Sequence, residues 1–137
     1  MADAVTSRTL FDDGGHVVMH FTNISDGTGE AAVTKVDASS LVGGGTTTRY
    51  AVEKIAWSTV GMGFNLLWDA TADVVFFTAG NNDSQGEIDF TKGGTGPGAA
   101  LTNNAGAGVT GDIQLTTVGH TLGDAYNLTL WLRKTAA

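Results

Sequence analysis

The histidines are the side chains of this 137-residue sequence with the clearest capacity for chemistry, because imidazole titrates near neutral pH and binds metals. They are His16, His20 and His120. On a strand, the spacing of His16 and His20 places both side chains on one face about 13 Å apart, too far for one metal ion. No Gly-x-Ser-x-Gly nucleophile turn accompanies them. We therefore interpret the histidines as exposed or structural.

Acidic side chains are the second group that could do chemistry. The segments Asp12–Asp13, Asp69–Asp73 and Asn81–Asp83 could offer oxygen ligands to calcium, but none has the ligand spacing and closing glutamate of an EF-hand. We interpret them as turn residues whose side chains bond the nearby backbone. A carboxylate pair for glycoside hydrolysis stays open with 14 Asp and Glu residues, although no sequence neighbours support one. We expect no enzyme activity, no metal ion and no cofactor.

Tryptophans give a third possibility, because exposed indole rings can stack against sugars. The three candidates are Trp57, Trp68 and Trp131, which would form a platform only if they are exposed together. A tryptophan on an alternating strand more often belongs to a core or an interface. Carbohydrate binding is therefore kept as an alternative function.

Alternating apolar residues indicate which elements must position these side chains. Between Tyr126 and Leu132 every second residue is apolar, so a strand there would have one apolar face and one face with Asn127, Thr129 and Trp131. Shorter runs with the same period recur along the chain, separated by Gly, Asn and Asp. The 20 glycines disfavour helices. The sequence predicts an all-β fold, a single antiparallel β-sandwich that is jelly-roll-like.

The chain is expected to have an N-terminal arm, residues 1–9, followed by one β-sandwich domain, residues 10–137. The stretch Met1–Arg8 is small and polar, and Lys92–Gly111 is interpreted as a long loop. In the continuous apolar run Val74–Phe77, either pair of residues could face inward. The expected core residues are Val17, Met19, Phe21, Ile55, Phe64, Leu66, Val75, Phe77, Ile88, Phe90, Ile113, Leu115, Leu128 and Leu130.

Charge and composition exclude several function classes. The net charge of −7 argues against binding to nucleic acid, which requires a basic face. No apolar run approaches the ~20 residues of a membrane helix, so no membrane partner is expected. The absence of cysteine excludes thiolate catalysis and cysteine-ligated zinc, and is compatible with a reducing compartment.

Three stretches of turn and strand sequence have a recognisable pattern: Leu10–Gly15 with Thr22–Glu30, Leu67–Thr71, and Asn103–Gly108 with Thr110–Ile113. Together they resemble a group of small virion proteins encoded by tailed phages, particularly phages of aquatic bacteria and cyanobacteria. The similarity is spread from Leu10 to Leu132. It implies a capsid decoration, or cement, protein that sits outside the major capsid shell and ties neighbouring capsomers together. The resemblance brings no catalytic residues with it.

The resemblance also implies the partners and the location. The major capsid protein and further copies of the chain are the expected partners, in a virion assembled in the cytoplasm of a bacterial host. We expect a homotrimer at a local symmetry axis, with a dimer as the alternative. The alternative function becomes a carbohydrate-binding or receptor-binding module of a phage fibre or tail, with the three tryptophans as glycan contacts. The expected capsid or subunit contacts are Ala2, Val5, Arg8, Leu10 and Phe11.

Overall fold

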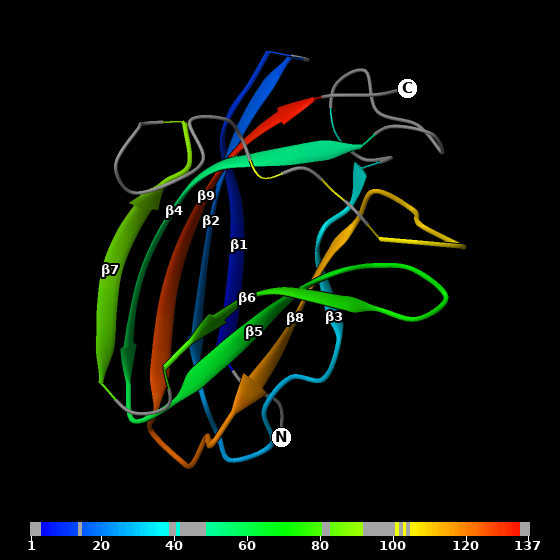
Figure 1. Ribbon diagram of the computed structural model, residues 1–137. Helices are drawn as coiled ribbons and strands as arrows, with labels where there is room; N and C mark the ends of the chain where they lie inside the picture. Colours follow the sequence, from blue (N-terminus) through cyan, green and yellow to red (C-terminus); the bar gives the residue numbers. More distant parts are fainter. Residues whose placement is uncertain are drawn as a thin grey trace.

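The computed structural model describes residues 4–13, 15–38, 41, 49–80, 83–91, 101, 103 and 105–134. Within these residues nine strands form two antiparallel sheets that pack against each other (Figure 1). The same residues include no helix long and apolar enough to cross a membrane. The predicted all-β sandwich is confirmed. Two parts of the sequence analysis lie outside the described residues. They are Asn81 with Asn82, and most of the first part of the expected Lys92–Gly111 loop, as far as residue 104.

The two sheets differ in size. The larger sheet has the order β1-β2-β9-β4-β7 and the smaller one the order β3-β8-β5-β6. The larger sheet consists of β1 (Ala4–Asp12), β2 (His16–Ile24), β9 (Ala125–Lys134), β4 (Tyr50–Val60) and β7 (Ser84–Asp89). The smaller sheet consists of β3 (Val33–Val36), β8 (Ile113–Val118), β5 (Gly63–Trp68) and β6 (Val74–Ala79).

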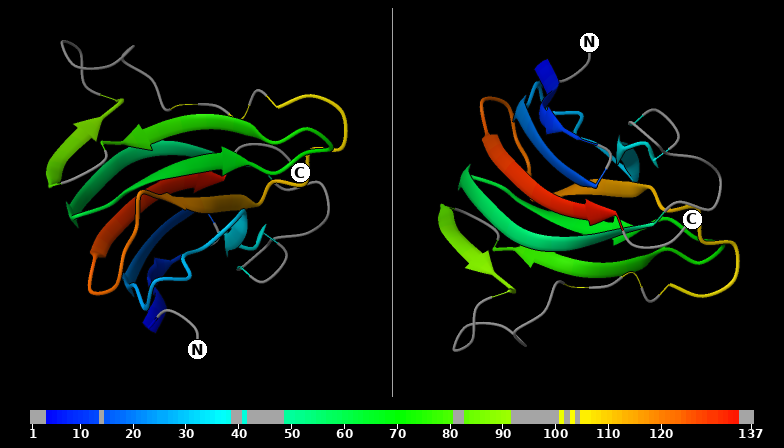
Figure 2. Two further views of the ribbon diagram at one scale, coloured as in Figure 1. Left: turned by 90° about the horizontal axis from the view of Figure 1, so that it is seen from below. Right: turned by 90° about the horizontal axis from the view of Figure 1, so that it is seen from above.

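Strands β2 to β9 have the connectivity of a jelly roll. β2 pairs with β9 and β4 with β7 in the larger sheet, and β3 pairs with β8 and β5 with β6 in the smaller one. This pairing is the strand order of a jelly roll. β1 adds a fifth strand beside β2. Both views of Figure 2 show β1 in blue and β7 in light green at opposite edges of the larger sheet, with β9 in red between them.

The core lies between the sheets and is built from strands that alternate as expected. Every second residue of β9 from Tyr126 to Leu132 is buried, and the intervening residues face outward. Most of the expected core residues are buried in the same way. Phe77 and Phe90 are only partly buried against the core, Ile88 is partly exposed, and Val75 is half-exposed.

A β-bulge explains why the placement of Val75 in the core is wrong. In the pairing of β5 with β6, Leu66 is opposite Phe77 whereas Leu67 is opposite Val75, so β6 contains one extra residue, Phe76. At a bulge, two residues of one strand oppose a single residue of the other, which breaks the period of two. Phe76 and Phe77 therefore both pack against the core, and Val75 faces the solvent.

The stretch expected to be an N-terminal arm is part of the sheet as far as the structure describes it. Residues 4–12 form β1, which pairs with β2 from Ala4 opposite Ile24 to Asp12 opposite Val17. One strand therefore crosses the expected boundary at residue 9. Residue by residue, β1 is exposed on both faces up to Phe11, so no apolar alternation marks it in the sequence. Ala2 lies outside the described residues.

Candidate interaction surface

The face of the larger sheet that points away from the core is an extensive surface of aligned side chains, which we call the outer face. Directly paired residues of antiparallel strands point to the same side, so the register of the strands arranges the outer face in rows. From one end of the sheet to the other, the first row is Ala4, Ile24, Ala125 and Val60; the second is Thr6, Thr22, Asn127, Ser58 and Gln85; the third is Arg8, His20, Thr129, Ala56 and Glu87; and the fourth is Phe11, Val18, Trp131, Lys54 and Asp89.

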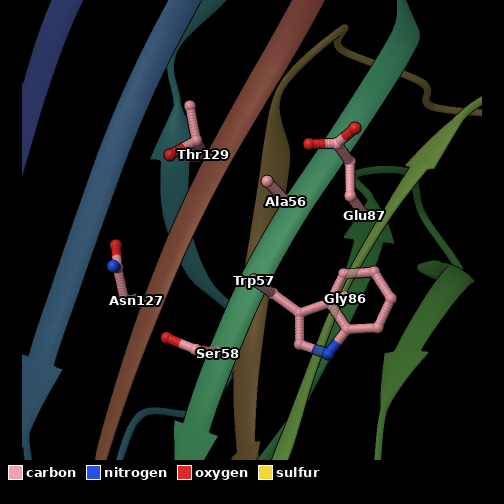
Figure 3. Close-up of a pocket in the computed structure, with 7 residues that line it drawn as sticks. All are labelled: Ala56, Trp57, Ser58, Gly86, Glu87, Asn127 and Thr129. Carbon is pink, nitrogen blue, oxygen red and sulfur yellow. The ribbon is translucent and has the colours of Figure 1, made fainter.

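A shallow depression of about 180 Å³ lies within the second and third rows. Figure 3 shows Asn127 and Thr129 of β9 on one side of it and Glu87 of β7 on the other, with the small side chains of Ala56 and Ser58 between them. The depression exists because β4 presents short side chains where its neighbours present longer ones. The other lining residues are Trp57 and Gly86.

The charges of these four rows are balanced, although the chain carries −7; the next pair along β2 and β9, His16 with Arg133, adds a cation beyond them. The four rows contain two cations, Arg8 and Lys54, and two carboxylates, Glu87 and Asp89. The Lys54 ammonium lies 3.3 Å from Oε1 of Glu87 and 4.7 Å from the centre of the Trp131 ring. Arg8 forms no ion pair within the described part of the chain. The face is thus cationic at its β1 edge and anionic at its β7 edge.

A buried polar cluster, which the sequence did not reveal, joins the β2–β3 connection to the rest of the sandwich. Lys35 Nζ lies 2.5 Å from Oε2 of the buried Glu30. Asn23 Nδ2 and the Tyr126 hydroxyl each donate a hydrogen bond of 2.7 Å to the other oxygen, Oε1. The Glu30 N–H donates to Oγ1 of Thr117 at 2.8 Å. One carboxylate therefore ties together β2, β3 and β9, and its backbone is bonded to β8.

No protein-family model and no curated protein matches this chain. What the outer face can do is therefore inferred from its own side chains. A neutral surface of aligned rows, with exposed apolar groups at its ends and a depression near one edge, suits contact with another protein surface.

The three tryptophans do not form the platform that glycan contact would require. Trp68 is buried in the core, and Trp57 points inward, where its ring packs edge-on to Phe77 at 4.9 Å between centroids. The Trp57 Nε1–H donates to Oγ of Ser84 at 3.0 Å. Trp131 is the tryptophan that belongs to the outer face. The three rings are therefore not exposed together, which was the condition for a shared platform: Trp57 and Trp68 point into the core and Trp131 lies on the outer face.

The histidines are spread over the molecule. His20 bonds through Nε2 to Asn127 on the outer face, and His16 lies 3.8 Å from a carboxylate oxygen of Glu53. His120 bonds through Nδ1 to a threonine of β8 at 3.2 Å. Among the residues that the structure describes, no three His, Asp or Glu side chains are placed to share a metal ion.

Some of the acidic side chains considered for calcium bond the backbone of their own turns, and others bond distant segments of the chain. Oδ1 of Asp13 accepts backbone hydrogen bonds from His16 and Gly15, at 2.6 and 2.8 Å, and these bonds lower the pKa of its carboxyl. Asp73 accepts the Ala70 N–H of its own turn at 3.1 Å, whereas Asp83 accepts the N–H of Gly61, in the β4–β5 connection, at 3.0 Å. Asp13 and Asp73 thus act as turn-forming side chains, whereas Asp83 and Asp69 bond distant segments, Asp69 through Thr110 Oγ1–H at 2.6 Å.

A pH-dependent contribution to stability is expected from Asp112, which precedes β8. Burial raises the pKa of this carboxyl above 3.8, and the charges of Asp37 and Asp69 add to the effect. Because the folded-state pKa is raised, ionisation of this carboxyl is less favourable in the folded chain than in the unfolded chain. The free energy of unfolding should therefore fall as the pH rises through that pKa. Oδ1 of Asp112 accepts a hydrogen bond of 2.9 Å from the Ala38 N–H. The variant Asp112→Asn keeps an oxygen that can accept this bond and removes the charge.

The urea midpoint of Asp112→Asn, measured from about pH 4 to pH 7, should therefore decline less with rising pH than that of the original chain. Asp73→Asn is a suitable control, because Asp73 also accepts a backbone hydrogen bond but is exposed. Identical pH profiles for Asp112→Asn and the original chain would contradict the assignment.

Proposed function

We propose that the chain is a structural virion protein that decorates the outside of a phage capsid and cements neighbouring capsomers. The observation that carries the proposal is β1, an edge strand whose side chains are open to solvent on both faces. Val5, Leu10 and Phe11 are 40, 51 and 51 % exposed. An open edge strand offers unpaired backbone groups to a neighbouring chain, and exposed apolar side chains add burial to such a contact.

The turn and strand motifs support the same role, because they resemble small virion proteins of tailed phages. The proposed partners are the major capsid protein and further copies of the chain, and Val5, Arg8, Leu10 and Phe11 on β1 are the proposed capsid or subunit contacts. The proposed location is the capsid surface, after assembly in the host cytoplasm. A cement protein needs extended contact surfaces and a rigid framework, which two packed antiparallel sheets provide.

The proposal is tested with capsids of the phage that encodes the chain, assembled without it. The purified chain is expected to bind these capsids to a fixed stoichiometry and to raise their thermal stability. Absence of the chain from purified virions, together with no binding to capsids, would refute the role. Saturable binding on a glycan array in place of capsid binding would favour a receptor-binding module of a fibre or tail.

The β1 contact predicts that the double variant Leu10→Ser with Phe11→Ser binds capsids about 30-fold more weakly, because each half-exposed side chain loses ~1 kcal/mol of further burial. Stability of the free chain should change by about 0.5 kcal/mol or less, because these side chains do not belong to the core. Val75→Ser, on the opposite sheet and similarly exposed, is the matched control and should bind normally. Equal losses in both variants would contradict a contact on β1.

A further inference from the structure

We propose that the outer face binds a second copy of the chain around a twofold axis that runs along β9. This inference does not depend on the capsid role. β9 is the middle strand of the five, and a twofold axis parallel to it exchanges β1 with β7 and β2 with β4. Each row stays at its own height along the axis. The strand registers therefore determine which residues of the two copies would meet.

The third row brings opposite charges together across this axis. Arg8, at the β1 end of the row, would face Glu87 of the second copy, at the β7 end, and the symmetry repeats the contact. Arg8 has no ion-pair partner in the described part of its own chain, and the Glu87 side chain is largely exposed. Both side chains are long and flexible, so they can meet across the gap between the two stacked sheets.

The first row brings apolar side chains together. Ile24 of β2 would face Val60 of β4 in the second copy, with Ala125 of the two copies at the axis. Ile24 and Val60 are 58 and 61 % exposed, which is unusual for side chains of this size on a paired strand. The twofold axis generates two such contacts, because Ile24 of each copy meets Val60 of the other.

The shapes of β2 and β4 are complementary in the middle rows. His20 of one copy would lie over Ala56 of the other, and Thr22 over Ser58. Ala56 and Ser58 form the floor of the 180 Å³ depression between β9 and β7 (Figure 3). The longer side chains of β2 thus enter the space that the shorter side chains of β4 leave open.

Charge and area also favour a second copy as the occupant. The four rows carry no net charge, so they add no net repulsion between two copies of a chain of charge −7. Five strands ~4.8 Å apart and four rows ~6.8 Å apart cover roughly 600 Å² on each copy. A contact of about 1,200 Å² in total is at the lower end of stable interfaces and indicates a dimer of moderate affinity. A self-complementary face closes with two copies, so it favours the dimer over the expected homotrimer.

Sedimentation velocity and multi-angle light scattering over roughly 5–500 μM test the proposal, since this range brackets a micromolar dissociation constant. The original chain should form a dimer. Arg8→Glu and Glu87→Arg should each weaken it about tenfold or more, because both symmetric contacts become repulsive. The double variant Arg8→Glu with Glu87→Arg should restore most of the affinity. The two positions lie at opposite edges of one sheet, about 19 Å apart, so rescue cannot arise within one copy.

Ile24→Asp should also dissociate the dimer, whereas Val33→Asp, on the edge of the other sheet, should leave it intact. The urea midpoint of each variant establishes that it is folded. A monomer throughout the concentration range, a trimer, or a dimer that the charge exchange does not restore would overturn the proposal. A dimer that resists every outer-face variant and is lost with Val5→Ser and Leu10→Ser, two exposed β1 residues outside the four rows, would instead indicate pairing of two β1 edges, and would also overturn it.

Discussion

Replacement of Lys35 by methionine is expected to destabilise the folded chain by about 3–5 kcal/mol, the range for breaking a buried ion pair from one side. The side chains of Lys35 and Glu30 are 3 and 6 % exposed, and their charged atoms lie 2.5 Å apart. Methionine retains most of the apolar volume of the lysine stem. The loss therefore comes mainly from the Glu30 carboxylate, which would keep its hydrogen bonds but lose its cation in the interior. Urea unfolding followed by circular dichroism measures the effect.

Two further variants isolate the cause. Adding Glu30→Gln to Lys35→Met removes the unpaired charge and leaves Oε1 as an acceptor for Asn23 and Tyr126, so much of the stability should return. Lys54→Met breaks an ion pair of similar chemistry on the surface and should cost about 1 kcal/mol or less. A Lys35→Met variant as stable as Lys54→Met would show that the buried pair does not hold the β2–β3 connection.

The fold could be predicted from the sequence where strands bury one face and expose the other. β2 and β9 have this environment, and their apolar period of two therefore identified both the strands and the core. β1 has the opposite environment, because both of its faces are open to solvent, and it has no such period. Composition alone cannot distinguish a polar edge strand from a polar arm.

Two other features depend on contacts between distant parts of the chain. The bulge that turns Val75 outward arises from the pairing of β5 with β6, and no single residue in that run signals it. Charged side chains are rarely buried, and nothing local in the sequence marks Glu30 and Lys35 as partners, but the fold brings them together inside. The rows of the outer face likewise follow from registers between β1, β2, β9, β4 and β7. Local sequence patterns predict which residues point outward but not which of them lie side by side.

Replacement of Trp68 by alanine is expected to cost about 3–5 kcal/mol, the range for removing a large aromatic side chain from a packed core. Trp68 is 1 % exposed, and its ring stacks on Phe76 with 4.0 Å between centroids and an interplanar angle of 18°. The bulge in β6 is what brings Phe76 to this position. Trp131→Ala is the matched control, because the same side chain is removed from the partly exposed outer face. It should cost less than half as much.

Trp68→Phe separates ring packing from the indole nitrogen. The buried Nε1–H of Trp68 has no hydrogen-bond acceptor among the described residues, and an unsatisfied buried donor costs about 1–3 kcal/mol. Phenylalanine keeps a six-membered ring for the stack on Phe76 and removes that donor, so the two effects offset each other and the net loss should be about 1 kcal/mol or less. Trp68 belongs to the smaller sheet, so Trp68→Phe should leave dimer affinity unchanged. Trp68→Phe as unstable as Trp68→Ala would show that the nitrogen, rather than the ring, stabilises this part of the core.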